Sequence, residues 1–175
     1  MKNLIFFVFT LMGIFCLASL SSAVELAEAV LADPDGRVIG EAVLVETSEG
    51  VYITVAVRGI TPGWHGIHIH DKGECKGPDY ESAGGHFNPF NREHGFRSPN
   101  GQHAGDLPNI LIGPDGTAAT IVSAPNVTLK EGQANSLMRE GGTALVIHDQ
   151  PDDYKTQPTG GSGARIACGV IRALR

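Results

Sequence analysis

The chain has 175 residues, a formal net charge of −6 and a hydrophobic content of 42%. This length suits a single domain with a core of its own, and the 23 glycines indicate many turns. The acidic balance argues against nucleic-acid binding, which calls for a basic surface.

At the N-terminus, a positive charge at Lys2 precedes an apolar run over residues 4–20 and three small residues at 21–23. This pattern predicts a secretory signal peptide over residues 1–23 and a mature domain over residues 24–175. A retained membrane anchor is the alternative, but the run is barely long enough to span a bilayer and small residues follow it. We therefore expect an exported protein, periplasmic or extracellular, without membrane attachment. Its net charge after cleavage would be about −7, since the signal segment carries one lysine and no acidic residue.

The rest of the chain contains short alternating or apolar runs separated by glycine and proline, which is typical of β-structure with tight turns. Residues 33–36 and 113–116 are such turns, and no segment has the periodicity of a substantial helix. We predict an all-β fold of eight antiparallel strands that form a sandwich or barrel. The predicted strands are residues 25–31, 37–46, 51–58, 66–70, 107–112, 117–123, 143–148 and 165–173.

The predicted strand 66–70 carries His68 and His70, and alternation places both imidazoles on one face of it. His148 ends the apolar strand 143–148, where its side chain would emerge at the strand end. With a fourth nitrogen from the loop described next, these residues would make a four-nitrogen site of the kind that favours Cu(II). A lone histidine is more often a hydrogen-bonded structural residue, so the copper hypothesis depends on the whole set.

Between the fourth and fifth predicted strands, a turn-rich stretch contains His86, His94, His103 and Asp106. It has no apolar periodicity, so something else must order a loop of this length. Three nitrogens and one oxygen match a closed tetrahedral zinc site, which contributes folding energy. A solvated polar loop is the alternative to this zinc hypothesis.

Two cysteines, Cys75 and Cys168, remain once the predicted signal peptide is removed. In a compartment that permits oxidation, an even count favours one disulfide, with two free buried thiols as the alternative.

Five motifs stand out in the chain: PGWHGIHIH at 62–70, GGHFNP at 84–89, HAGDLP at 103–108, VIH at 146–148 and GARIACGVI at 163–171. Together they resemble the motifs of the copper/zinc superoxide dismutase family, of the secreted bacterial kind, and the resemblance runs over about residues 27–173. Ile67 stands where that family usually has an aromatic residue, and Trp64 precedes a structural-looking His65, but neither departure falls on a metal-binding position.

The resemblance implies a Greek-key fold with long metal-binding and electrostatic loops, one copper and one zinc per subunit, and dismutation of superoxide to dioxygen and hydrogen peroxide. His86 would bridge the two metals as an imidazolate and exchange a proton during turnover, and Arg165 would guide the anionic substrate. The implied copper ligands are His68, His70, His86 and His148, and the implied zinc ligands are His86, His94, His103 and Asp106.

The resemblance also implies the Cys75–Cys168 pairing and a carboxylate hydrogen-bonded to one copper and one zinc histidine. Asp152 is the best match for that carboxylate by spacing, and Asp153 is the close rival. The candidate residues for steering superoxide by their charge are Lys155, Lys72 and Lys76, with solvated surface lysines as the alternative.

Two other classes of function remain. A noncatalytic metal-binding or copper-delivery protein on the same fold would lack a copper ligand or Arg165, and a structural adhesion domain would need no such histidine set. The sequence leaves monomer and homodimer open.

Overall fold

The computed structural model describes residues 25–174, so the predicted signal peptide over residues 1–23 lies outside the described part of the chain. The described residues form ten strands and a single turn of 3-10 helix, η1 (Glu81–Ala83). The strands are β1 (Leu26–Ala32), β2 (Val38–Thr47), β3 (Gly50–Arg58), β4 (Gly63–His65), β5 (Ile67–His70), β6 (Ile110–Ile112), β7 (Thr117–Ala124), β8 (Ala144–His148), β9 (Arg165–Val170) and β10 (Arg172–Ala173).

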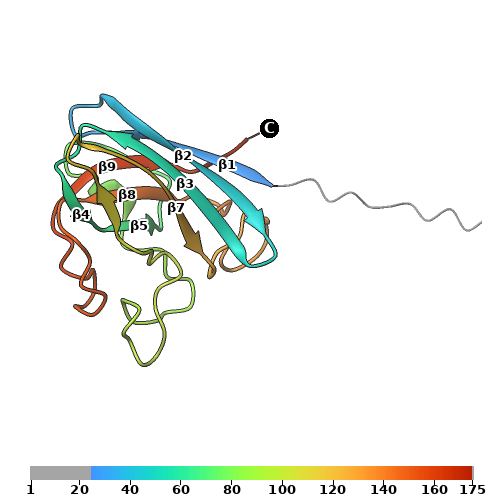
Figure 1. The fold of residues 1–175 in the computed structure, drawn as a ribbon. Helices are drawn as coiled ribbons and strands as arrows, with labels where there is room; N and C mark the ends of the chain where they lie inside the picture. Colours follow the sequence, from blue (N-terminus) through green and yellow to red (C-terminus); the bar gives the residue numbers. More distant parts are fainter. Residues whose placement is uncertain (1–24, 175) are drawn as a thin grey trace, which may run out of the picture.

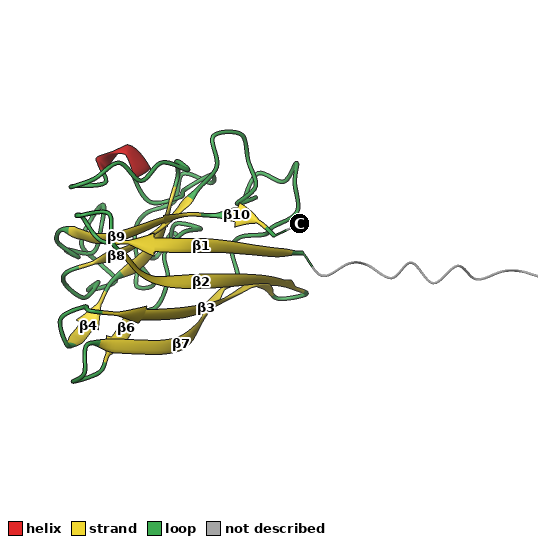
Figure 2. Cartoon of the chain, turned by 90° about the horizontal axis from the view of Figure 1, so that it is seen from above, coloured by secondary structure: helices red, strands yellow, loops and turns green. Residues whose placement is uncertain are grey.

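The strands pair throughout in antiparallel fashion. The main sheet has the order β5-β8-β9-β1-β2-β3-β7, β10 pairs with β1 beside it, and β4 pairs with β6 in a small second sheet. Neighbours that are distant in sequence, such as β9 with β1, make the crossover connections of a Greek key. The predicted all-β, antiparallel Greek-key fold is confirmed, and its long loops project from one side of the sheet (Figures 1 and 2).

All eight predicted strands are present, with three differences. Strand β4 was not predicted, because three residues are too few for a period to be visible. Strand β6 begins at Ile110 and not at residue 107, because Pro108 lacks an N–H and the N–H of Asn109 binds the hydroxyl of Tyr154. The predicted strand 165–173 is broken at Ile171, whose N–H binds the carbonyl of Thr143 and not a neighbouring strand.

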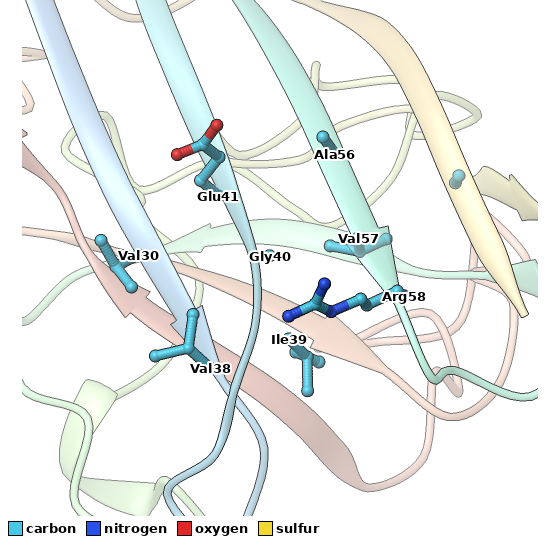
Figure 3. Close-up of a pocket in the computed structure, with 9 residues that line it drawn as sticks. Val30, Val38, Ile39, Gly40, Glu41, Ala56, Val57 and Arg58 are labelled. Carbon is cyan, nitrogen blue, oxygen red and sulfur yellow. The ribbon is translucent and has the colours of Figure 1, made fainter.

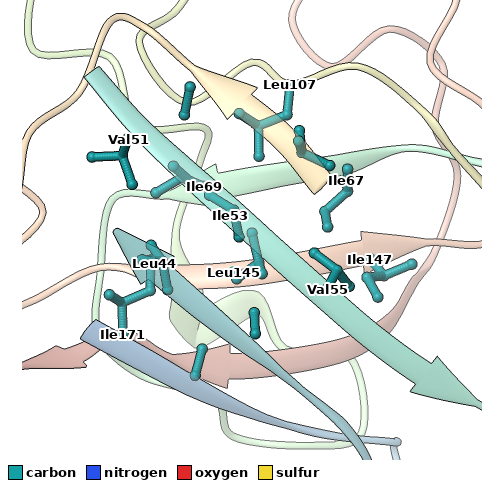
Figure 4. Close-up of a cluster of buried hydrophobic side chains, with 14 of the residues drawn as sticks. Leu44, Val51, Ile53, Val55, Ile67, Ile69, Leu107, Leu145, Ile147 and Ile171 are labelled. Atoms are coloured by element: carbon teal, nitrogen blue, oxygen red, sulfur yellow. The ribbon is translucent and has the colours of Figure 1, made fainter. Parts of the chain in front are cut away.

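The core fills the space enclosed by the curled main sheet (Figure 4). On β3, Val51, Ile53, Val55 and Val57 are buried and alternate with exposed residues, as expected for a strand with one wet face. Strand β5 is buried on both faces. Ile67 and Ile69 belong to the core cluster, so the intervening histidines lie on the opposite face.

A separate groove of about 370 Å³ lies on the outer face of β1, β2 and β3 (Figure 3). Gly40, Glu41 and Arg58 are among the residues that line it. Neither histidine nor cysteine lines it. Within residues 25–174, no helix is long and apolar enough to cross a membrane.

Candidate metal centre

Four histidines that are distant in sequence converge beside β5 and β8. We call His68, His70, His86 and His148 the four-histidine cluster; each offers one nitrogen, and these nitrogens lie within 4.8 Å of one another. Strands β5 and β8 pair with His68 opposite Val146 and His70 opposite Ala144, so both histidines of β5 lie beside the strand that ends at His148. His86 joins them through a bridge between its backbone and that of His70.

Within residues 25–174, one buried nitrogen of each histidine in this cluster has no hydrogen-bond partner. Leaving a buried polar atom unpaired costs about 1–3 kcal/mol, so four together call for a ligand that accepts lone pairs. A metal cation is such a ligand, and neutral imidazoles are its common partners. The unpartnered atoms are His68 Nδ1, His70 Nε2, His86 Nε2 and His148 Nε2.

The second ring nitrogen of each strand histidine is held by the protein. His68 Nε2 lies 2.8 Å from Asp152 Oδ2, and His70 Nδ1 lies 2.9 Å from the Gly84 carbonyl oxygen. His148 Nδ1 lies 3.4 Å from the Gly163 carbonyl oxygen. Such contacts fix the orientation of a ring and the nitrogen that it presents to a metal.

Asp106 organises a second group, the aspartate cluster, which comprises His86, His94, His103 and Asp106 itself. Its Oδ1 lies 2.9 Å, 3.1 Å and 3.2 Å from the Nδ1 atoms of His86, His94 and His103. Its Oδ2 accepts the N–H groups of Gly95 and His103. Three nitrogens and a carboxylate, all buried, form a donor set that suits tetrahedral zinc.

His86 belongs to both clusters, because its Nε2 points to the first and its Nδ1 to the second. The two clusters therefore adjoin through a single imidazole. Its ring stacks on that of His68, with centroids 3.9 Å apart.

The pKa values of the histidines differ between the two clusters. Burial outweighs the hydrogen bond to Asp106 and lowers the pKa of His86 to about 4. Burial and the neighbouring His68 and His86 lower the pKa of His148 to about 3, and burial likewise holds the pKa of His70 well below its usual value. These rings are neutral at pH 7 and ready to bind a cation.

In the aspartate cluster, burial opposes the charged form of His94, but hydrogen bonds to Asp106 and Asp152 outweigh it and raise the pKa of His94 to about 9. Burial also opposes the charge of Asp106, but hydrogen bonds from His103, His86 and His94 lower the pKa of its carboxyl well below the usual range. A metal binding here would displace a proton from His94.

Asp152 connects the clusters from the loop between β8 and β9. Its Oδ2 binds His68 Nε2, and its Oδ1 lies 3.0 Å from His94 Nε2. Its rival Asp153 is exposed and accepts hydrogen bonds from Lys155 and Thr156. The structure therefore brings Asp152, and not Asp153, to the two histidines.

Arg165 begins β9 opposite His148. Its guanidinium donates to the carbonyl oxygens of Tyr80 and Gly84, and the Gly84 carbonyl also holds His70, so the half-buried guanidinium lies beside the four-histidine cluster. Of the candidate steering residues, Lys76 forms an ion pair with Glu74 at 2.7 Å, whereas Lys72 and Lys155 are exposed and form no ion pair among the described residues.

The predicted disulfide is confirmed: Cys75 and Cys168 are bonded, with their Cα atoms 5.7 Å apart. It ties the segment before η1 to β9 and closes a loop with a sequence separation of 93. In the chain-entropy model such a loop closure stabilises the fold by about 4 kcal/mol.

Sequence reasoning missed two side-chain amides that hold Asp152 and His94 through their backbone groups. The side-chain amide of Asn109 binds both the N–H and the C=O of Asp152, at 2.8 Å and 2.9 Å. The amide of Gln157 binds the backbone of His94 in the same way. Amides in loops carry no periodic signal, and the only motif near either of them is HAGDLP, which ends one residue before Asn109.

His65, which the sequence presented as structural, binds the backbone with both ring nitrogens. These lie 2.7 Å from the His148 carbonyl oxygen and 2.8 Å from that of Thr61, so neither nitrogen is available to a metal.

The fold is an antiparallel Greek-key β-sandwich, and its two adjoining buried clusters share one histidine. These features define a class of β-sandwich proteins with two metal sites. The fit extends to the atoms: within the described part of the chain, the first cluster offers four unpartnered nitrogens, and three histidines of the second surround the Asp106 carboxylate. The family model described as copper/zinc superoxide dismutase matches residues 38–171, and the chain belongs to this family.

Relatives and solved structures agree. The chain is 51% identical over 164 residues to "Superoxide dismutase [Cu-Zn] 2" of Aquifex aeolicus, which covers 93% of this chain and 96% of that protein. A crystal structure of a SOD-like protein from Bacillus subtilis is 46% identical with a TM-score of 0.80, covering 82% of this chain and 96% of that one. The Cu/Zn superoxide dismutase from Brucella abortus is 31% identical with a TM-score of 0.69, covering 85% of this chain and 100% of that one.

Proposed function

We propose that the protein dismutates superoxide to dioxygen and hydrogen peroxide as an antioxidant enzyme. The observation that carries this proposal is the four-histidine cluster, in which four buried nitrogens converge without partners beside an arginine. Its copper ligands are His68, His70, His86 and His148, and its zinc ligands are His86, His94, His103 and Asp106. Copper, when bound, supplies one-electron redox chemistry, and zinc supplies a fixed positive charge beside His86.

The chain contributes orientation and proton handling. With zinc held on its Nδ1 side, where Asp106 fixes the ring, His86 would hold a proton at Nε2 whenever that atom does not bind copper. Two superoxide anions and two protons give dioxygen and hydrogen peroxide, so a ring that accepts and returns a proton is required within reach of the substrate. Asp152 keeps His68 and His94 in place through one carboxylate.

Arg165 binds the anion. Two backbone carbonyls orient its guanidinium, which remains charged at any physiological pH. The net charge of about −7 that remains after cleavage repels superoxide at long range, but distant charges are screened at physiological salt, where the Debye length is about 8 Å. Short-range attraction by Arg165, with help from Lys155 or Lys72, therefore dominates.

We also propose that residues 1–23 are removed on export and that the domain over residues 24–175 acts in the periplasm or outside the cell, as a soluble monomer or homodimer. The Cys75–Cys168 disulfide and the bacterial relatives are consistent with an exported protein.

The test is a superoxide-removal assay on purified protein that carries one copper and one zinc per chain, with metal content measured on the same sample. Catalytic removal of superoxide is expected. Protein that holds both metals but removes superoxide no faster than the uncatalysed reaction would contradict the proposal and favour a noncatalytic metal-binding role.

A further inference from the structure

Gln157, in the loop between β8 and β9, binds the zinc-ligand candidate His94 through both polar groups of its backbone. The His94 N–H donates to Gln157 Oε1 at 2.8 Å, and Gln157 Nε2 donates to the His94 carbonyl oxygen at 3.0 Å. The same Nε2 also donates to the carbonyl oxygen of Lys155 at 3.2 Å. The amide is thus fully used, with its acceptor and both of its N–H groups engaged.

As a result, the loop between β8 and β9 forms hydrogen bonds with every polar atom of His94 except one. Gln157 binds the N–H and C=O, and Asp152 binds ring Nε2 at 3.0 Å. Only Nδ1 remains, and it points to Asp106 Oδ1 at 3.1 Å. His103 differs, because its N–H and its Nδ1 both bind Asp106 and neither is bound by the β8–β9 loop.

The two loops also meet closely at their backbones. A Cβ on Gly95 would lie 2.2 Å from the carbonyl oxygen of Tyr154, and a Cβ on Gly160 would lie 1.8 Å from Asp152 Oδ1 and 2.6 Å from His94 Nε2. Both glycines have positive φ, at 91° and 68°. The two loops are therefore closely packed around His94, and Gln157 lies at the edge of this packed region.

We propose that Gln157 is a positioning residue for zinc: its amide fixes the backbone of His94 so that ring Nδ1 is aimed at the metal, and it joins the zinc loop to the loop that carries Lys155. This inference rests on the zinc assignment of the proposed function. The tethers at ring Nε2 and at both polar groups of the backbone resist any motion of His94 away from zinc.

The test compares zinc release from the copper- and zinc-loaded protein to an excess of chelator. The variants are Gln157→Met, which keeps the length of the side chain and removes the hydrogen bonds, and Gln157→Ala. The matched control is Gln133→Ala, an exposed glutamine between β7 and β8 whose side chain makes no hydrogen bond within the described residues. Because partners outside the ligand set typically contribute 10–100-fold in metal affinity, we expect release to be at least roughly tenfold faster in both Gln157 variants, with copper retained.

A purely structural role would lower the stability of the metal-free variants and leave ligand geometry unchanged. We therefore also measure the visible spectrum of Co²⁺ placed in the zinc site, which should change in the Gln157 variants, and the melting temperature of the metal-free proteins, which should not. In case the variants fold poorly, hydrogen exchange of the wild-type His94 amide provides a second measurement, and this amide should be protected.

Zinc release and Co²⁺ spectra equal to those of the wild type and Gln133→Ala would overturn the inference, as would a rapidly exchanging His94 amide. A wild-type protein that binds copper but no zinc would overturn the zinc assignment itself and this inference with it. The first two results leave the superoxide assay unaffected, so the two failures are distinguishable.

Discussion

The two metal-type clusters differ in what holds them. Three members of the four-histidine cluster lie on β5 and β8, whose backbone pairing fixes their spacing before any metal is bound. The aspartate cluster lies in the connection between β5 and β6 and is held by one buried carboxylate. The first is built on rigid sheet and the second on loops, which depend on side-chain contacts and on the ion for their order.

The two clusters also differ in the pKa values of their histidines. The strand-borne His148 and the shared His86 have lowered pKa values, whereas His94 has a raised one. Burial, with a contribution from neighbouring histidines, keeps the rings of the sheet-borne cluster neutral, whereas the loop-borne cluster contains the negative charges of Asp106 and Asp152.

The largest expected effect comes from removing one ligand unique to each cluster. His148→Ala should abolish copper binding and superoxide turnover while zinc and the fold remain, because only the sheet-borne cluster loses a ligand. Asp106→Ala should release zinc and lower the melting temperature, because the loop loses the carboxylate that all three histidines contact. Metal content at equilibrium and thermal unfolding measure both, and equal zinc loss in the two variants would contradict the two-site assignment.

Reduction of the Cys75–Cys168 disulfide should make the segment around η1 more mobile before it affects the main sheet. We expect a loss of about 4 kcal/mol in the free energy of unfolding. Gly84, whose carbonyl holds His70 and Arg165, follows the tethered segment, so hydrogen exchange should rise there before it rises in β8. Mass spectrometry of the unreduced protein must show the two cysteines linked, and free thiols in the exported protein would contradict this account.

Arg165→Ala should slow the enzyme by roughly tenfold and flatten its dependence on salt, because electrostatic attraction raises association rates by about 10–10³-fold. Superoxide dismutases are among the enzymes near the diffusional limit, so attraction should be visible in kcat/KM. The rate of the wild type should fall as ionic strength rises. Arg58→Ala, which removes an exposed arginine on the outer face of β3, is the matched control. A wild-type rate that rises with salt would mean that the net negative charge dominates.

The smallest effect concerns the pH dependence of the metal-free protein. His86 and His148 have folded pKa values of about 4 and about 3, below the ordinary 6.5, so the unfolded chain binds protons first and stability falls as pH drops below 6.5. His94 has a folded pKa of about 9, so its stabilising contribution is present below pH 6.5 and is lost as pH rises through 9. Denaturant unfolding should therefore show maximal stability near pH 6.5. In His148→Ala, the free energy of unfolding should fall less steeply below pH 6.5 and should keep its wild-type dependence above that pH. An unchanged fall below pH 6.5 would assign the acid dependence to groups other than His148.

Much of the fold was predictable because burial imposes a period on strands. The alternation on β3 and the apolar run of β8 are properties of neighbouring residues, and they located eight strands. The three-residue β4 and the break at Ile171 were not predictable, because both depend on hydrogen bonds to segments far away in the chain.

The members of the two clusters were also predictable, because copper and zinc restrict the donor types and the motifs that carry them are local in sequence. Their partners were not. Spacing left Asp152 and Asp153 as rivals, and only the folded loop shows that the first reaches His68 and His94 while the second faces solvent.

The sequence by itself determined the all-β class, the two donor sets and the pair of cysteines, since each follows from residue type and short-range spacing. The tertiary structure alone decided that the unpartnered nitrogens converge, that His86 belongs to both clusters, and that the amides of Asn109 and Gln157 hold the backbones of Asp152 and His94. The physical reason is that hydrogen bonds between loops depend on where the sheet brings distant segments together, and that placement leaves no periodic trace in the chain.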